Sequence, residues 1–450
     1  MSPHDPLPTA RRVRPTARLV GSLAIAVVGC AVVGLVVSRG LHTPSRVVFA
    51  IIAVAALAHL MLALMPDQVQ RRAIAGSATG SLSVAALVPA YNEDPGALRR
   101  CLRSFLEQTR RPQTVVVVDD GSTAADYDEV RDWFQAKACA VGVRAVWTRT
   151  PNRGKRHAQI EGVRLTPEAD VYVTVDSDSI LDRRAIENGL VPFADPTVQS
   201  VAALILTTNY RQSLLTRWMD VYCLGLQLFE RSAFSRLRAV MVNSGGCALY
   251  RAPVIRDNVD AYLGETILGR PVQFSDDSML TLFALRRGRA VQREDCFAFT
   301  LMPANLDHHV RQQVRWMRGS FIRSIWRMRY LPLTRAAYWL HLVKWLLYVL
   351  AFATLVHLAL DGALARWETV VTGAAAAVAL YVMAVLRYVL VIRSDQGHAQ
   401  RWLTFATAPI AALWGLTVLR VMRWYAIATF AKTGWGTRSE VEVRDVTVPA

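Results

Sequence analysis

Two long apolar runs near the N-terminus constrain the fold of this chain more than any other feature. Leu19 to Val37 contains no charged side chain over 19 positions, and Val47 to Met65 repeats the pattern with His59 as its only ionisable group. A helix of this length, rising about 1.5 Å per residue, nearly crosses the hydrocarbon core of a bilayer. A cleaved signal peptide is the alternative for the first run, but its length and the second run directly behind it favour two membrane spans.

Arginines border this apolar hairpin on both outer sides, at Arg11, Arg12, Arg14, Arg18, Arg71 and Arg72. The positive-inside rule therefore places both ends of the hairpin in the cytoplasm. These borders also account for much of the net charge of +17, so we expect contact with membrane lipids and no nucleic-acid partner. A hydrophobic fraction of 53% excludes intrinsic disorder, and six dispersed cysteines exclude a disulfide scaffold.

The C-terminal third of the chain is apolar again. Tyr338 to Leu360 and Val370 to Ile392 are each long enough to span, and they contain Lys344 and Arg387. These cations either face a bundle interior or snorkel to the interface. The remaining apolar stretch, up to Ala431, is interrupted by Pro409, so the number of crossings and the side of the tail stay open.

Between these ends the composition is that of an α/β domain. We expect strands at 83–88, 114–118, 144–148 and 171–175, and a helix from Pro95 through Phe105. Alternating strands and helices predict a parallel sheet, with ligands at the carboxyl ends of the strands. The chain then divides into a tail 1–18, a transmembrane hairpin 19–65, an α/β domain 66–310, amphipathic interfacial helices 311–335, C-terminal membrane helices 336–431 and a tail 432–450.

Acidic pairs follow two of the expected strands. Asp119 and Asp120 end the strand at 114–118, and Asp176 and Asp178 follow the strand at 171–175. Mg²⁺ and Mn²⁺ prefer carboxylate oxygens and keep positions free for diphosphate oxygens, so Asp176 and Asp178 are candidate ligands; a solvated loop is the alternative. Asp119 and Asp120 either accept a hydrogen bond from a nucleotide base or cap a turn.

Three further segments contain candidate functional residues, and each also has a purely structural interpretation. Lys155 and Arg156 open a helix and form either an anion site or a solvated basic turn. Asp276 and Asp277 precede an apolar helix; one of them is a candidate general base, unless the pair only favours the helix N-terminus. Tyr91 either stacks on a base or packs on the sheet edge.

The segment that begins QQVRW is rich in arginine and aromatic residues up to Arg329. Such a stretch is typical of a helix lying on anionic lipid. Gln312, Arg315 and Trp316 can also form a compact group, with the guanidinium on a diphosphate and the indole on a sugar face.

The order of the motifs VPAYNE, VVVVDDGS, NRGKRHAQ, VTVDSDS, VNSGGCALYR, SDD and QQVRW between apolar ends is specific. It resembles the processive, inverting glycosyltransferases of family two, which include hyaluronan, chitin-oligosaccharide and cellulose synthases. GKRHAQ, VNSGG and the terminal GWGTR are most similar to bacterial hyaluronan synthases. The resemblance implies an α/β GT-A (Rossmann-like) domain in the cytoplasm, inserted between the transmembrane helices of a plasma-membrane protein.

The implied activity is that of a UDP-sugar hexosyltransferase. It would polymerise UDP-GlcNAc, together with UDP-GlcA, into a β-linked polysaccharide and extrude the growing chain. One alternative is a chitin-oligosaccharide or other β-glycan synthase, and another is a non-processive enzyme that adds one sugar to a lipid carrier. A transporter or receptor that merely binds a nucleotide would leave the motifs unexplained. The oligomeric state, the sugars and their linkage remain open.

The resemblance also implies a role for each candidate residue. The residues that would hold UDP are Tyr91, Asp119, Asp120, Lys155, Arg156, Asp176, Gln312, Arg315 and Trp316. The Mg²⁺ or Mn²⁺ ligands would be Asp178, directly, and Asp176. The acceptor entrance would be lined by Ser244, Gly245, Gly246 and Trp316. The general base would be Asp277, beside Asp276, and here Ser275 stands where close relatives usually have glycine.

Overall fold

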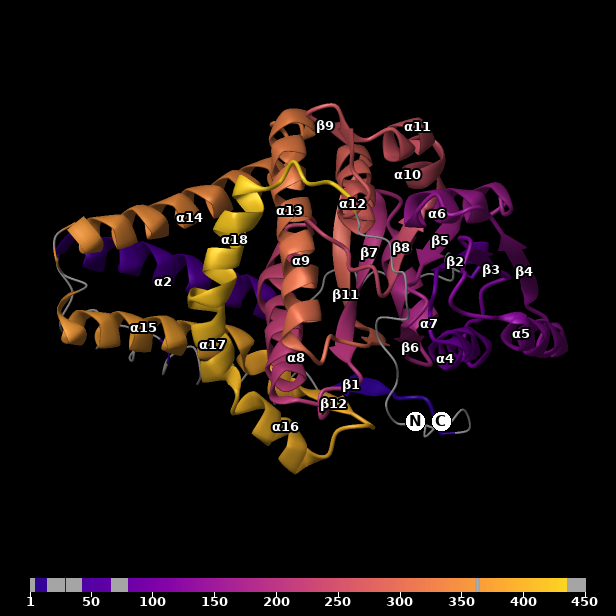
Figure 1. Ribbon diagram of the computed structural model, residues 1–450, viewed down its shortest axis with the longest axis horizontal. Coiled ribbons are helices and arrows are strands. Elements are labelled where there is room, and N and C mark those ends of the chain that lie inside the picture. Colours follow the sequence, from indigo (N-terminus) through magenta and orange to yellow (C-terminus); the bar gives the residue numbers. More distant parts are fainter. Residues whose placement is uncertain are drawn as a thin grey trace.

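A computed structural model describes residues 5–13, 29, 43–65, 80–360, 362 and 365–434 of the chain. An α/β domain occupies one end of the molecule, and long helices project from the other, with helix α13 between them (Figure 1). The first expected membrane span, 19–37, lies outside the described residues apart from Gly29.

One mixed sheet of eight strands forms the α/β domain, in the order β4-β3-β2-β5-β8-β7-β11-β6. The four expected strands are confirmed and run parallel: β2 (Val84–Ala90), β3 (Thr114–Asp119), β4 (Arg144–Arg149) and β5 (Val171–Thr174). The other half of the sheet consists of β6 (Ile180–Leu181), β7 (Val198–Thr207), β8 (Ala248–Arg251) and β11 (Arg289–Thr300). β8 is antiparallel to both β5 and β7, so the sheet is not parallel throughout.

Helices cover both faces of this sheet. They include α4 (Pro95–Leu106), α5 (Asp128–Ala140), α6 (Lys155–Arg164), α7 (Ala185–Leu190) and α12 (Asp276–Arg287). Successive side chains of a strand point to opposite faces, so β3 packs Val115 and Val117 into one core and Val116 into the other. α4 begins where expected, because Asp94 accepts a hydrogen bond from the Ala97 N–H at 2.8 Å and Pro95 favours the first helical position.

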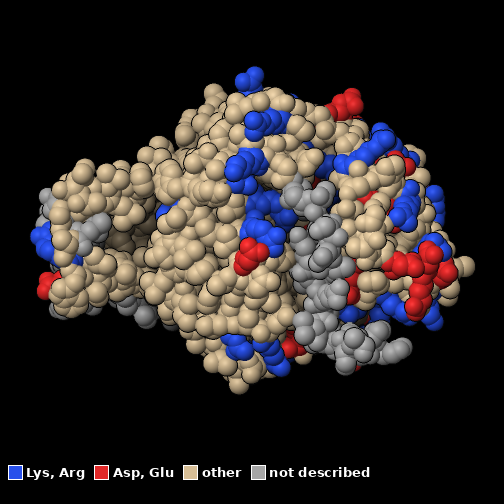
Figure 2. Space-filling model, viewed as in Figure 1, with Lys and Arg blue, Asp and Glu red and all other residues tan. Residues whose placement is uncertain are grey.

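Four segments of the described chain are long and apolar enough to cross a membrane: Arg46–Leu64, Ala336–Leu360, Trp367–Leu390 and His398–Ala428. The first three correspond to α2 (Thr43–Leu64), α14 (Ala336–Leu360) and α15 (Trp367–Val385) with the 3₁₀ turn η5 (Leu386–Leu390). They project together from the α/β domain (Figure 1). Leu346 and Val349 of α14 are 59% and 56% exposed, and Figure 2 shows few charged side chains on this part of the molecule, as a lipid-facing surface requires.

The last apolar stretch is broken into α16 (His398–Phe405), α17 (Ala408–Leu416) and α18 (Val418–Ala428). Pro409 lies in the first turn of α17, where its missing N–H costs nothing. α18 packs along α13 (Leu306–Tyr330), at a steep angle to α14 and α15 (Figure 1).

α13 differs from the expected helix lying on lipid. One side of it is buried against α12 and the other against α14 and α18, so Arg323 is 0% and Arg327 4% exposed. These two arginines point into the protein because the helix lies between the α/β domain and the apolar helices. Arg329 at the end of α13 is exposed, as expected.

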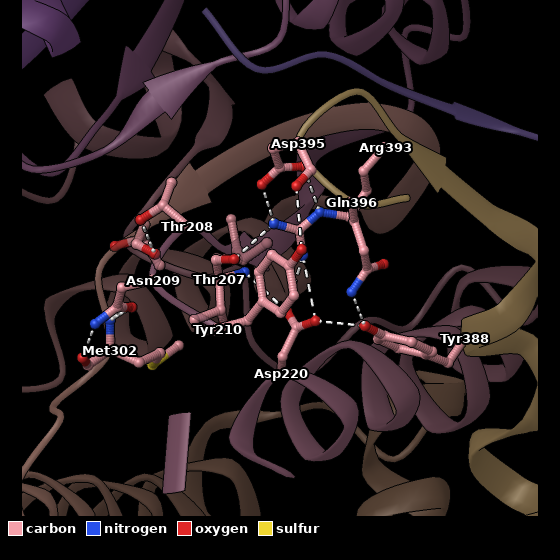
Figure 3. A network of polar contacts seen from close by, with 12 residues as sticks. Thr207, Thr208, Asn209, Tyr210, Asp220, Met302, Tyr388, Arg393, Asp395 and Gln396 are labelled. Carbon is pink, nitrogen blue, oxygen red and sulfur yellow. Dashed lines mark hydrogen bonds and ion pairs between the residues drawn. The ribbon is translucent and has the colours of Figure 1, made fainter. Parts of the chain in front are cut away.

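Two elements close the seam between the α/β domain and the apolar helices. β1 (Ala10–Arg12), in the expected N-terminal tail, pairs antiparallel with β12 (Val391–Arg393). Asp220 of α8 (Leu214–Leu226) pairs with Arg393, which also donates a hydrogen bond to the Thr207 carbonyl at 2.6 Å (Figure 3). We call the residues around this pair the seam network. It fastens the end of β7 to the segment after α15.

Candidate active site

The candidate carboxylates gather at the carboxyl edge of the parallel strands, as the sequence predicts. Asp119 is the last residue of β3, and Asp176 and Asp178 follow β5. Asp276 and Asp277 are the first residues of α12. The sheet order places β5 between β2 and β8, so these loops share one end of the domain.

Lys155, the first residue of α6, joins two of the acidic loops. Its Nζ lies 2.6 Å from Asp176 Oδ1 and 2.9 Å from Asp276 Oδ2. Burial alone would lower the pKa of Lys155, but the two carboxylates outweigh it and raise that pKa above its ordinary value. Lys155 is therefore a fixed cation at the centre of the site.

Asp120 holds the loop that leads to Lys155. Its carboxylate accepts hydrogen bonds from the backbone N–H groups of Arg153 at 3.0 Å and Gly154 at 2.8 Å. Burial raises the pKa of Asp120, and these hydrogen bonds partly oppose the shift. Gly121, at φ +75°, permits this packing, because a Cβ there would lie 2.7 Å from the Asn152 nitrogen. Asp119 accepts from the Ser122 N–H at 2.8 Å and lies 3.4 Å from Arg149.

The adjacent carboxylates of Asp276 and Asp277 have opposite pKa shifts. Asp276 is buried, which would raise its pKa, but Lys155 outweighs burial and lowers it. Burial, followed by repulsion from Asp276, raises the pKa of Asp277 to about 7, with Lys155 opposing. A carboxylate with a pKa near neutrality can both accept and release a proton under physiological conditions, as a general base must.

The turn before these aspartates has a left-handed backbone at Ser275, with φ 63° and ψ 39°. This conformation costs a residue with a side chain about 1–2 kcal/mol, which explains why glycine suits the position. α13 approaches the same turn through Gly319, where a Cβ would lie 2.7 Å from the Ser275 side chain. The aspartate pair is thus held against the helix that carries QQVRW.

The glycine loop at 244–246 lies directly beside the metal-candidate carboxylate. A Cβ on Gly245 would lie 2.8 Å from Asp176 Oδ2, so only glycine allows this approach. Ser244 Oγ accepts a hydrogen bond from Arg231 Nη1 at 2.7 Å. Burial lowers the pKa of Arg231 to about 9, with Asp277 opposing the shift. Arg231 could not be predicted from sequence, because it lies in the π-helical segment Gln227–Arg231 and no motif surrounds it.

Asp178 is half-buried, and hydroxyl groups surround its carboxylate. Ser179 Oγ and Thr300 Oγ1 lie 3.4 Å from its two oxygens. In the described part of the chain, no three His, Cys, Asp or Glu residues form a ready metal cluster. Oxygen-only donors from one or two carboxylates fit Mg²⁺ or Mn²⁺, which takes its remaining ligands from water and phosphate.

The other candidates lie around the rim. Trp316 is 44% exposed on α13, Arg315 is half-buried one residue earlier, and Gln312 lies one turn before them. Tyr91 follows β2 and is half-buried. These side chains therefore remain accessible to a ligand.

Arg156 has a different environment from its neighbour Lys155. Its guanidinium is 5% exposed and donates to Glu265 and to the carbonyls of Tyr262 and Phe274, at 2.7–2.9 Å. Sequence reasoning missed Glu265, because a single glutamate between α11 (Val259–Leu263) and β9 (Thr266–Ile267) matches no motif.

Residues 82–319 match the family model described as "Glycosyltransferase like family 2". The chain belongs to glycosyltransferase family 2. It is 29% identical over 368 residues to a hyaluronan synthase of Streptococcus pyogenes, which covers 80% of this chain and 84% of the relative. It is 30% identical over 370 residues to an N-acetylglucosaminyltransferase of Bradyrhizobium diazoefficiens, covering 80% of this chain and 72% of the relative.

Among solved structures, the fold is similar to that of a mannosyltransferase from Pyrobaculum calidifontis in complex with GDP-Man and Mn²⁺. The TM-score is 0.51 at 20% identity, covering 88% of this chain and 99% of the other. The α/β domain of this family 2 glycosyltransferase thus has the expected GT-A fold.

Proposed function

We propose that the protein is a processive, inverting transferase that polymerises UDP-GlcNAc, together with UDP-GlcA, into a β-linked polysaccharide and exports the product across the plasma membrane. The observation that carries the proposal is the Lys155 bridge. It joins the Asp176 loop to the aspartate pair, and Asp277 lies at the start of α12 with a pKa raised to about 7. The similarity to a hyaluronan synthase over 80% of the chain supports the choice of sugars.

The donor end of the site consists of the loops after β2, β3 and β5. Asp119 and Asp120 would hold the uracil, and Tyr91 would stack on it. Lys155 would contact the diphosphate, together with Arg315 and Gln312 from α13. Asp178, with Asp176, would hold Mg²⁺ or Mn²⁺, which when bound neutralises charge on the departing UDP.

At the acceptor end, Asp277 would take the proton from the sugar hydroxyl as that hydroxyl attacks the anomeric carbon with inversion. Asp276 stays ionised beside Lys155 and shapes the turn. Gly245 and Gly246, which pack closely against Asp176 and Ser179, would line the acceptor entrance, and Trp316 would stack on the terminal sugar of the acceptor. Arg315 stabilises the negative charge that develops on the leaving diphosphate.

An aromatic group between α8, α13 and α17 supports export of the product. The rings of Trp218 and Trp414 lie 5.4 Å apart, and His309 lies 5.9 Å from Trp414. The indole N–H groups and both His309 ring nitrogens are buried without a hydrogen-bond partner among the described residues. Burial lowers the pKa of His309 to about 4, so it is neutral. Neutral rings with free polar atoms suit the faces and hydroxyls of a passing sugar chain.

The α/β domain would lie in the cytoplasm, where UDP-sugars are made. The arginines around the N-terminal hairpin support this orientation. An engineered cysteine on the exposed face of α5 should resist a membrane-impermeant thiol reagent in intact cells and react after lysis. Labelling in intact cells would contradict the orientation.

Radiolabelled UDP-GlcNAc and UDP-GlcA, supplied alone and together to membranes that carry the protein, test the proposed activity. A long polymer that needs both donors is the expected result. A polymer of GlcNAc alone would favour the chitin-type alternative, and one sugar on a lipid would favour the non-processive one. No product with any donor would overturn the proposal.

A further inference from the structure

Glu265 is a buried carboxylate shared by two arginines from different helices. It is 5% exposed and precedes the short hairpin of β9 (Thr266–Ile267) and β10 (Arg270–Pro271). Arg156 of α6 donates to its Oε2 at 2.7 Å, and Arg323 of α13 donates to its Oε1 at 2.8 Å. Trp326 Nε1 donates to Oε1 at 2.7 Å. We call Arg156, Glu265 and Arg323 the Glu265 cluster.

The same two guanidinium groups also hold the turn that precedes the aspartate pair. Arg156 Nη2 donates to the Phe274 carbonyl at 2.8 Å. Arg323 Nη2 reaches the next carbonyl, that of Ser275, at 3.4 Å, and its Nε lies 3.2 Å from Ser278 Oγ. Consecutive carbonyls are therefore held from two sides, on either side of the left-handed backbone of Ser275.

Burying a charged cluster of this kind costs free energy unless the ion pairs have good geometry and hydrogen bonds satisfy the remaining donors and acceptors. Two cations face one carboxylate, and each arginine also donates to one backbone carbonyl of the Phe274–Ser275 turn. A planar guanidinium with fixed donors can hold a carbonyl and a carboxylate at the same time, which an ammonium cannot do. The chemistry of the cluster therefore matches the task of fixing that turn.

We propose that Arg156 and Arg323, paired through Glu265, are positioning residues that hold the Phe274–Ser275 turn so that Asp277 is directed at the acceptor hydroxyl. In this arrangement Arg156 acts through the turn and not by contact with the donor, unlike its neighbour Lys155. The inference rests on the proposed function of Asp277 as the general base.

The matching experiment uses purified full-length protein in lipid nanodiscs, with Arg156→Lys and Arg323→Lys as the first variants. Lysine keeps the charge and loses the forked donor geometry. We expect kcat for sugar transfer to fall by about 10-fold to 10²-fold, because a small displacement of a catalytic group has effects of this size. The Kd for UDP and the KM for the donor should remain within about 2-fold of wild type, since uniform binding is untouched.

Rescue separates positioning from general stability. Glycine adopts the left-handed backbone without help. The loss of kcat that Arg156→Lys causes should therefore be smaller in a Ser275→Gly background than in the wild-type background. Arg251→Lys is the matched control: Arg251 donates to the carbonyls of Phe193, Val198 and Asp195, away from the site. Its kcat per folded molecule should stay at the wild-type value.

Three results would overturn the inference. The first is an Arg156→Lys variant that loses donor affinity about 10-fold at unchanged kcat. The second is a loss of kcat in the Arg156→Lys and Arg323→Lys variants that equals the loss in Arg251→Lys. The third is an absence of rescue by Ser275→Gly. If a lysine variant does not fold, Glu265→Gln replaces it, because this substitution keeps the shape of the side chain and removes the shared charge. The same kcat and Kd measurements then test the inference. Sugar transfer by the wild-type protein is measured first. Its absence would count against the proposed function and not against the positioning role.

Discussion

Two buried ionic groups, the seam network around Arg393 and the active-site group around Lys155, each pair a cation with aspartates, yet they have opposite effects. In the seam, Arg393 and Asp220 are 1% and 0% exposed in their side chains, and Tyr388 and the Thr207 N–H also donate to Asp220 (Figure 3). In the active site, Lys155 pairs with Asp176 and Asp276, Gln159 Nε2 donates to Asp276 at 3.4 Å, and Asp176 is 34% exposed in its side chain.

The difference lies in how completely the carboxylates are matched. Burial would lower the pKa of Arg393, but Asp220 and Asp395 outweigh it, so the pair stays charged. Asp277 is compensated only in part, by Lys155 and by the Ser278 N–H at 2.6 Å, and its pKa rises to about 7. A fully matched cluster fixes one geometry, whereas an under-compensated one can change its protonation state. The first suits a joint between domains and the second suits chemistry.

The largest expected effect comes from removing the under-compensated carboxylate. Asp277→Asn should reduce sugar transfer by about 10²–10⁴-fold, the usual contribution of a general base, while UDP binding survives. Asp276→Asn should instead weaken donor binding, because Lys155 loses one of its two partners. Calorimetry of UDP binding beside polymer yield distinguishes them. If the two variants exchange these behaviours, the assignments are reversed.

Asp178→Asn tests the metal assignment and should also abolish most activity. Loss of a carboxylate ligand removes charge stabilisation of the leaving diphosphate worth several kcal/mol, or roughly 10²-fold or more in rate. Activity of the wild type in chelator-washed membranes should return on adding Mg²⁺ or Mn²⁺, and that of the variant should not. Normal polymer synthesis by the variant without added metal would exclude Asp178 as a ligand.

The seam network should respond in stability and not in chemistry. Breaking a buried pair costs about 3–5 kcal/mol, so Asp220→Asn should lower the thermal midpoint in nanodiscs by several degrees. The matched control is Glu129→Gln at the exposed pair with Arg99, where the expected loss is about 0–1 kcal/mol. Equal losses in the two variants would show that the seam is not a structural joint.

The sequence predicted the strands β2 to β5, and it could not predict the two short strands β6 and β8 for a physical reason. Runs such as Thr114–Asp119 are continuous and apolar, as strands covered on both faces must be. β8 is only four residues long and β6 only two, so neither has a pattern that distinguishes a strand from a loop. Their place depends on pairing with β5, β7 and β11.

The candidate site divides in the same way. Carboxylates at strand ends are visible in sequence because the strands are visible, so Asp119 and Asp176 could be placed. The direction in which a basic side chain points cannot be predicted from sequence. Lys155 and Arg156 are adjacent, yet Lys155 faces the acidic loops and Arg156 faces Glu265. Partners more than 100 residues apart in the chain, such as Arg156 and Glu265, are set by tertiary packing alone.

The pH dependence of kcat and of stability tests the contrast between the active-site group and the seam network. Below a pKa of about 7, Asp277 is protonated and inactive as a base, so kcat should rise about tenfold per pH unit and level off above neutrality. Stability should move the other way. The folded state holds a proton on Asp277 between about pH 4 and pH 7 that the unfolded state releases, so this contribution falls as pH rises. The thermal midpoint of wild type relative to Asp277→Asn should show that slope, and a flat difference would contradict the raised pKa.

The smallest expected effect concerns the backbone at Ser275 (φ 63°). Ser275→Gly removes a left-handed cost of about 1–2 kcal/mol, but glycine also gains about 0.4–1 kcal/mol of freedom in the unfolded chain, so the net gain in stability should be about 0–1.6 kcal/mol. Leu268→Gly is the matched control, because Leu268 has φ 49° and lies 71% exposed in the β9–β10 hairpin. Both variants should raise the thermal midpoint slightly, and only Ser275→Gly should alter kcat, since only that turn precedes Asp277. If Leu268→Gly changes kcat as much as Ser275→Gly does, the backbone at Ser275 has no special link to the base.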